Sequence, residues 1–323
     1  MTYIRTLAIV GLTVAALGAT APAFAQTWPT KPIRLIVPYS AGGGADNAAR
    51  ILAQTMGKSL GQTVVIDNRP GASGMIGGQA VAQADPDGYT VLYDASTYAV
   101  NPVLRKMPFD AAKDLIPVSL AVSVPNILVV PPKAPYNNFK EFLAYAQKNP
   151  GKVTYASYGA GSPAHLVGEL LKNQAKLDML HVPYKGGAPA LADVMGGQVD
   201  AYFANAASGL SYVQSNRLKA IAVTSAKRMA ALPEVTTIQE NGFKDFDVLE
   251  WNGFFVPKGT PAAVVDRLAK EVKAAVNDAE TRGKLEKLGL DPVGSTPAEF
   301  ASFIQKETTR WGALVKSNNI TVE

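Results

Sequence analysis

The chain has 323 residues, with 31 lysine and arginine residues against 26 acidic ones, and it contains no cysteine. The lack of cysteine excludes disulfide bonds, thiol chemistry and a lipid-anchored lipoprotein start. Because the basic residues are scattered rather than gathered in one stretch, we expect no nucleic-acid surface.

The first 25 residues are predicted to be a secretory signal peptide. Arg5 gives a positive start, residues 7–19 form an uncharged apolar stretch, and Ala23-Phe24-Ala25 has the small-x-small pattern of a cleavage site. A membrane anchor is the alternative, but the apolar run is shorter than the ~20 residues that a bilayer core requires, and Pro22 interrupts it. We therefore expect export, with cleavage after Ala25.

Strand and helix patterns alternate over most of the chain, which is typical of parallel βα units. Residues 33–37 form a mostly apolar, β-branched run, and short strands are predicted at residues 64–66 and 90–92. Between them Leu52, Met56 and Leu60 recur every four residues, as on one face of a helix. The segment up to about Ser123 is interpreted as one α/β unit.

A second unit is predicted from about Pro125. Asn138 and Glu141 have the spacing of a capping box, and Pro150-Gly151 ends that helix. A strand, a loop and a helix with Pro163 in its first turn follow. These are predicted at residues 153–156, 159–162 and 164–174, with shorter strands at 181–182, 199–203 and 220–224.

The C-terminal part is predicted to be helical, with starts at Thr260-Pro261 and at residues 296–299. Helices without strands of their own must pack on a sheet made elsewhere, so we expect the chain to return to the first unit at residues 250–256. The predicted fold is α/β with two lobes, each a βα sheet unit, and a cleft between them. The first lobe would comprise residues 26–124 and 250–323, and the second residues 125–249.

Glycine-rich loops follow predicted strands in both units. In residues 38–46, Gly42, Gly43 and Gly44 let the backbone approach a ligand, and Asp46 is expected to cap the next helix. In residues 157–165, Ser162 would cap a helix in the same way. Each lobe would then present a helix N-terminus to the cleft, which suits an anionic ligand. Plain turns are the alternative, and for a further loop at residues 68–78 backbone packing is as reasonable as ligand contact.

Catalytic motifs are not found in the sequence. Neither the loop at residues 38–46 nor the loop at residues 68–78 has the spacing of a dinucleotide fingerprint, and there is no phosphate-binding P-loop. Neither Ser73 nor Ser162 lies in a G-x-S-x-G motif. His165 and His181 are the only histidines and form no metal motif. We expect no cofactor, no metal and no enzyme activity. The alternative is an exported α/β enzyme, a nucleotide-dependent oxidoreductase or a hydrolase, that uses the same loops.

Several short motifs, in order along the chain, resemble those of the solute-binding proteins of tripartite tricarboxylate transporters. They include Trp28-Pro29, Val37-Pro38-Tyr39 with the following glycines, Asp87-Gly88-Tyr89-Thr90, residues 182–187, Gly197-Gln198-Val199-Asp200 and Trp251-x-Gly253.

The resemblance implies a monomeric, two-lobed periplasmic binding protein of a type II-like fold. Such a protein captures a small organic carboxylate, a di- or tricarboxylate or an aromatic one, through backbone N–H groups and hydroxyls, and delivers it to membrane permease subunits. The implied ligand-binding residues are Tyr39, Ser40, Ala41, Gly42, Gly43, Gly44, Asp46, Ser96, Ser157, Tyr158, Gly161, Ser162, His165 and Asn205.

The chain departs from the family pattern at positions that bear on the ligand. Ser40 replaces a frequent proline. Ala204 precedes Asn205 where an aspartate is common, and the loss of that acid argues against a ligand with an ammonium group. Tyr158 replaces a usual alanine, which favours a flat or aromatic carboxylate.

Overall fold

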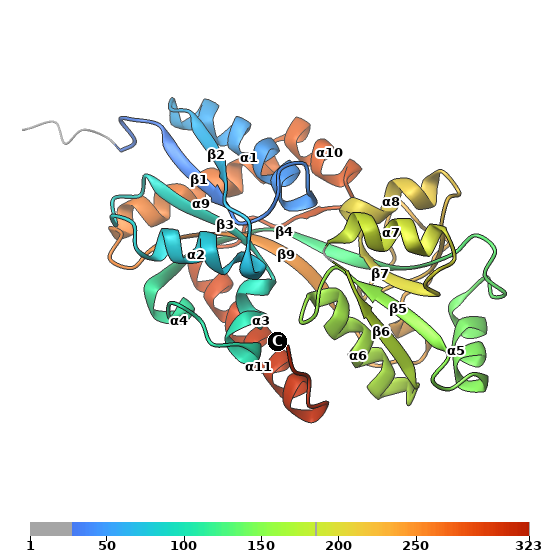
Figure 1. Ribbon diagram of the computed structural model, residues 1–323. Helices are drawn as coiled ribbons and strands as arrows, with labels where there is room; N and C mark the ends of the chain where they lie inside the picture. The colour runs from blue at the N-terminus through green and yellow to red at the C-terminus, as the bar shows by residue number, and fades with distance from the viewer. Residues whose placement is uncertain (1–27, 185, 323) are drawn as a thin grey trace, which may run out of the picture.

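The computed structural model describes residues 28–184 and 186–322, and in it two lobes lie side by side, joined by β-strands (Figure 1). The predicted signal peptide, residues 1–25, lies outside the described residues. Within the described part, no helix is both long and apolar enough to cross a membrane.

The first lobe is built on strands in the order β2-β1-β3-β9-β4. β1 pairs in parallel with β2 and β3, and β9 pairs antiparallel with β3 and β4. Its strands are β1 (Ile33–Val37), β2 (Val64–Asn68), β3 (Thr90–Ala95), β4 (Leu115–Val130), β9 (Leu249–Pro257) and β10 (Asp291–Pro292). Its helices are α1 (Gly44–Leu60), η1 (Ala72–Gly74), α2 (Met75–Ala82), α3 (Thr97–Leu104), α4 (Ala111–Asp114), α9 (Ala262–Asn277), α10 (Ala279–Lys287) and α11 (Pro297–Ser317).

The second lobe continues the same sheet through β4, β7, β5 and β6, with β8 also paired to β4. β5 is parallel to β6 and β7, as expected for βα units. Its own strands are β5 (Val153–Ser157), β6 (Met179–Pro183), β7 (Ala201–Asn205) and β8 (Lys219–Val223). Its helices are α5 (Phe139–Lys148), α6 (Pro163–Ala175), α7 (Gly187–Met195), α8 (Ala206–Gln214) and η2 (Gln239–Asn241).

The long strand β4 belongs to both lobes. It pairs with β9 as far as Pro125, which stands opposite Leu249, and from Asn126 onward it pairs with β7 and β8. The sequence analysis did not predict this strand, because prolines are typical of strand edges and β4 contains Pro117 and Pro125. The lobe boundaries at residues 124–125 and 249–250 stay a prediction.

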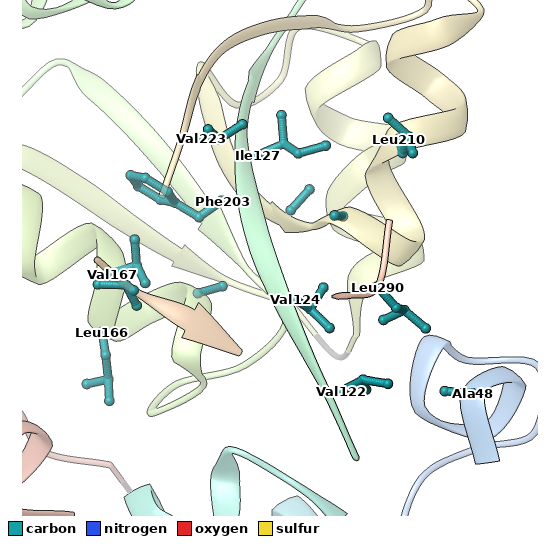
Figure 2. Packing of buried hydrophobic residues seen from close by; sticks show 14 of the residues in the cluster. Ala48, Val122, Val124, Ile127, Leu166, Val167, Phe203, Leu210, Val223 and Leu290 are labelled. Atoms are coloured by element: carbon teal, nitrogen blue, oxygen red, sulfur yellow. The ribbon is translucent and has the colours of Figure 1, made fainter. Parts of the chain in front are cut away.

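One hydrophobic cluster runs through both lobes along β4 (Figure 2). Val122, Val124 and Ile127 of β4 are fully or almost fully buried, with Ala48 of the first lobe and Phe203 of the second in the same cluster. Burying each large aliphatic side chain contributes about 1.5–3 kcal/mol relative to exposure. The connection between the lobes is therefore part of the packed core.

Most of the predicted elements are confirmed. Leu52, Met56 and Leu60 are the buried stripe of α1, and Asn138 caps α5. Thr296 and Glu299 form the capping box of α11. Two details differ. The N-cap of α9 is Pro261, and the Thr260 hydroxyl instead donates to the Pro257 carbonyl at 2.8 Å. The C-terminal region also contains a short strand, β10, which pairs with β4.

Candidate functional site

The loops predicted to bind a ligand lie at the carboxyl ends of parallel strands. β1 and β3 lead into α1 and α3, and β5, β6 and β7 lead into α6, α7 and α8. Ligands bind at this edge of open α/β sheets, because helix N-termini with unpaired N–H groups gather there. The two lobes meet at these edges, where the guanidinium of Arg105 donates to the Ala160 carbonyl at 3.4 Å.

The first loop presents small, exposed residues to solvent. Ser40, Ala41, Gly42 and Gly43 are all exposed. Gly42 has a φ of +81°, a conformation that favours glycine, and Gly43 is the N-cap of α1 without any side-chain cap. The first N–H groups of α1, from Gly44 onward, therefore lack a capping side chain and remain able to bind an anion.

Asp46 does not cap α1, contrary to the prediction. It is the third residue of the helix and only 1% exposed. Its carboxylate accepts hydrogen bonds from Gly42 N at 2.8 Å, Arg50 Nε at 2.9 Å and Asn68 Nδ2 at 2.9 Å. Although burial opposes it, these hydrogen bonds lower the pKa of Asp46. The ionised Asp46 carboxylate thus holds the loop in shape through its hydrogen bond from Gly42 N.

Tyr39 is anchored within the first lobe. Its hydroxyl donates to Asp94 Oδ1 at 2.7 Å and lies 2.7 Å from the Thr97 hydroxyl at the start of α3. Burial and the Asp94 charge raise the pKa of Tyr39 well above its usual value, and burial raises the pKa of Asp94 to about 7. Asp94 and Thr97 were not predicted as site residues, since single polar residues in apolar strand and helix patterns give no motif.

The second loop is held by its own polar side chains. The Ser162 hydroxyl accepts from His165 N at 3.4 Å, so the predicted cap is confirmed, and Gly161 N donates to His165 Nδ1 at 3.0 Å. Ser157 Oγ donates to the Gly159 carbonyl at 2.9 Å. These contacts order the loop at the N-terminus of α6, but they also occupy Ser157 and His165 with internal partners.

His165, which is buried, and His181, which is half-buried, form a stacked pair. Their ring centroids are 3.8 Å apart with an interplanar angle of 8°, and His181 Nε2 lies 2.7 Å from the Ser157 hydroxyl. Burial lowers the pKa of His165, and burial together with the neighbouring His165 lowers the pKa of His181 to about 4. At neutral pH both rings are therefore uncharged, and neither attracts an anion by charge.

Tyr158 lies where the two lobes meet. Burial raises its pKa well above the usual value, and the nearby Glu250, Tyr202 and Tyr39 raise it further. Because Tyr39 belongs to the first lobe, the Tyr158 phenol has neighbours on both sides of the lobe boundary.

An acidic residue stands beside Asn205. Asn205 caps α8 by accepting from Ala207 N at 3.0 Å, and its Nδ2 donates to Glu250 Oε2 at 3.0 Å. Burial raises the pKa of Glu250 to about 7. Glu250 of β9 thus places an acid beside Asn205 although Ala204 is not acidic, and the expectation that the ligand carries no ammonium group stays a prediction. Sequence reasoning missed Glu250, although a charged residue within the apolar run of β9 was the available signal.

Ser96 is the remaining predicted residue. It precedes α3 in a helical conformation, so its hydroxyl does not cap the helix. The side chain is 2% exposed, and Oγ has no hydrogen-bond partner among the described residues. The described residues also contain no group of His, Cys, Asp and Glu that could hold a metal ion.

Comparison with known proteins shows the same architecture in relatives of substantial identity. Protein BugT of Bordetella pertussis is 36% identical over 319 residues, 98% of each chain. A solved periplasmic transporter is 40% identical with a TM-score of 0.85, over 92% of this chain and all of the other. The R. palustris protein Rpa4515, solved with adipate, is 33% identical with a TM-score of 0.85, over 91% of this chain and 99% of the other.

The family model that matches describes the tripartite tricarboxylate transporter family receptor, and it covers residues 48–320. Both this description and the structural relatives are those of binding proteins that serve transporters, so the alternative of an exported enzyme finds no support. The fold and the resemblance expected from the sequence are confirmed. The chain belongs to the tripartite tricarboxylate transporter receptor family.

Proposed function

We propose that this protein binds a small organic carboxylate between its two lobes and delivers it to the membrane subunits of a tripartite transporter. The observation that carries the proposal is the start of α1, which has no side-chain cap, follows a loop of small exposed residues, and lies next to Ala207 and Asn205 of the second lobe. Such a helix start binds carboxylates through backbone N–H groups and the helix dipole. The relative solved with adipate supports this ligand class.

The ligand would contact one loop from each lobe. Backbone groups of residues 40–44 and the N-terminus of α6 at Ser162 are the proposed carboxylate contacts, with the Ser96 hydroxyl as a further donor. Tyr39 and Tyr158 would lie along the ligand between these loops. Asp46, Ser157 and His165 would act indirectly, because their side chains already hold the loops in shape.

The cellular setting is part of the proposal. We infer that the protein works as a monomer in the periplasm, after cleavage of the signal peptide behind Ala25. The lobes would comprise residues 26–124 with 250–323, and residues 125–249, and they would close on the ligand by bending at β4 and β9.

Thermal shift followed by isothermal titration calorimetry tests this function. A ligand that binds only the folded protein raises its melting temperature. At a ligand concentration of one hundred times Kd, the free energy of unfolding increases by about 2.7 kcal/mol. A panel of aliphatic and aromatic mono-, di- and tricarboxylates should contain acids that shift the melting temperature, whereas NAD and ATP should not. If nucleotides bind and no carboxylate does, the proposal is wrong.

A further inference from the structure

Three stacked rings join β5, β6 and α6, which lie side by side in the second lobe (Figure 1). His181 of β6 lies between the other two rings: its centroid is 5.0 Å from that of Tyr155 and 3.8 Å from that of His165. The Tyr155 hydroxyl donates to Glu169 Oε1 at 2.6 Å, and Lys172 Nζ donates to the same oxygen at 2.7 Å. The His181 ring is therefore held in place on both of its faces.

The hydrogen bonds around Ser157 fix the direction in which His181 acts. The Ser157 hydroxyl has a single proton and donates it to the Gly159 carbonyl at 2.9 Å. His181 Nε2, which lies 2.7 Å from Ser157 Oγ, must therefore be the donor in that contact. Gly159 N also donates to Ser157 Oγ, at 3.2 Å. His181 thus completes the hydrogen bonds of a fully buried serine that binds both the N–H and the carbonyl group of Gly159.

His165, the ring stacked on His181, holds the same loop further along the chain. Its Nδ1 accepts a hydrogen bond from Gly161 N at 3.0 Å. A backbone N–H group can only donate, so Nδ1 carries no proton and the proton of the neutral ring is on Nε2. The planes of the two imidazoles differ by only 8°. The loop that carries Tyr158 and leads to the Ser162 cap is thereby bound to the ring stack at Gly159 and at Gly161.

We propose that His181 is a positioning residue for ligand binding: through Ser157 and His165 it sets the conformation in which residues 157–162 meet the carboxylate. The inference rests on the proposed function, in which this loop binds the ligand. His181 would not contact the ligand itself, because Nε2 is bonded to Ser157 and the ring faces are covered by other rings. It would raise the affinity by holding the loop in its binding conformation before the ligand arrives.

Calorimetry at pH 7.5, with the tightest ligand among succinate, adipate, malate and terephthalate, tests this role. His181→Leu keeps a side chain of similar size but removes the donor, and we expect the affinity to fall by about five- to tenfold. His181→Gln places a side-chain N–H group at about the reach of Nε2 and should restore most of the affinity. If glutamine binds no better than leucine, His181 does not act as a donor and the inference is wrong.

A double-mutant cycle shows whether His181 acts through Ser157. Ser157→Ala should weaken binding at least as much as His181→Leu does. Adding His181→Leu to Ser157→Ala should cause little further loss, because the hydrogen bond between the two side chains is already gone. Two independent losses that multiply would show that His181 acts by another route and would overturn the inference.

The matched control lies at the opposite end of β5. The Thr154 hydroxyl donates to Asp200 Oδ2 at 2.8 Å, and Thr154→Val removes this hydrogen bond far from the loop. In urea unfolding the control should lower the free energy of unfolding much as Ser157→Ala does, whereas its affinity should equal that of the natural protein. If Thr154→Val weakens binding as much as His181→Leu, the loss reflects general stability and the positioning role is refuted.

Nuclear magnetic resonance checks the geometry without any ligand. The chain has two histidines, so proton–nitrogen correlation spectra of the imidazole groups contain two ring systems. At pH 7.5 we expect both rings to be neutral with the proton on Nε2, and Ser157→Ala to shift the Nε2 resonance of His181. A His181 ring that carries its proton on Nδ1 would contradict the donor role.

Failure of this inference and failure of the proposed function give different results. If carboxylates bind the natural protein and His181→Leu binds them as tightly, the carboxylate function stands and the positioning role is refuted. If no carboxylate binds the natural protein, the proposed function fails and the positioning role with it.

Discussion

Gly44 at the start of α1 and Ala207 near the start of α8 touch across the two lobes. A Cβ atom on Gly44 would lie 3.3 Å from Ala207 Cβ and 3.8 Å from Asn205 Oδ1. Two helix N-termini from different lobes are thereby brought together at one edge of the cleft. A carboxylate bound there would accept hydrogen bonds from the N–H groups of both helix N-termini and would be stabilised by both helix dipoles. Ligand binding would therefore be coupled to closure of the lobes.

Replacing Gly44 with leucine should therefore weaken ligand binding by ten times or more. The new side chain has no room against Ala207 while the lobes are closed, but it is compatible with a helix start. Calorimetry with any carboxylate that binds the natural protein measures the loss, and combining Gly44→Leu with Ala207→Gly should restore part of the affinity. Unchanged affinity in the single variant would show that the ligand is held without this contact.

The helix cap of the second loop offers a matched pair of variants. Ser162→Ala removes the cap of α6, and Asn138→Ala removes the cap of α5. Each should lower the free energy of unfolding by about 1 kcal/mol, because a side-chain cap pairs an N–H group that is otherwise unpaired. Urea unfolding checks this. Only Ser162→Ala should also weaken carboxylate binding, and an equal loss of affinity in both variants would remove α6 from the site.

The sequence allowed the two loops to be predicted because each combines a strand pattern, small residues and a helix start within ten residues. Ser162 and Pro163 illustrate this, since the cap and the first-turn proline are local signals and both are observed. The strand β4 was missed for the opposite reason. Its stability comes from pairing with β9, β7 and β8, and pairing partners far along the chain override the local signal of Pro117 and Pro125.

The same limit explains what was missed in the site. Asp46 has the residue type and approximate position of a cap, but the cap position of α1 is Gly43, three residues before it. Glu250 and Asn126 come from β9 and β4, and only the fold brings them to Asn205 and Tyr158. Local patterns predict where backbone N–H groups collect, whereas the side chains that meet between lobes depend on tertiary structure.

Tyr158 is expected to select a flat ligand. Stacking of an aromatic ring contributes about 0.5–1.5 kcal/mol, so Tyr158→Ala should weaken an aromatic dicarboxylate such as terephthalate by up to roughly tenfold. Succinate and adipate should lose little. Titration of both proteins with these acids decides the question. Similar losses for all acids would mean that the ring covers any ligand, and tighter binding of the aliphatic acids by the natural protein would refute an aromatic preference.

The stacked histidines should make the protein less stable in acid. The pKa of His181 falls from 6.5 to about 4 on folding, so between these values the unfolded chain binds more protons than the folded one. Stability then decreases as the pH falls from 6.5 to 4. His181→Gln removes this pH dependence. The variant should be less stable than the natural protein at pH 6.5, and this difference in unfolding free energy should become smaller as the pH falls to 4. Urea unfolding at several pH values tests this, and a constant deficit would contradict it.

Glu250 should act in the opposite direction on the ligand-free protein. Its pKa rises from 4.5 to about 7 on folding, so between these values the folded chain binds more protons than the unfolded one, and stability decreases as the pH rises. Glu250→Gln keeps the shape without the charge and should gain stability relative to the natural protein from pH 4.5 to pH 8. The change is on the order of 2–3 kcal/mol, because one unit of pKa corresponds to about 1.4 kcal/mol. Urea unfolding of both proteins at pH 5 and pH 8 measures it. If the difference between the two proteins is the same at both pH values, Glu250 ionises without penalty and is not isolated from water in the closed cleft.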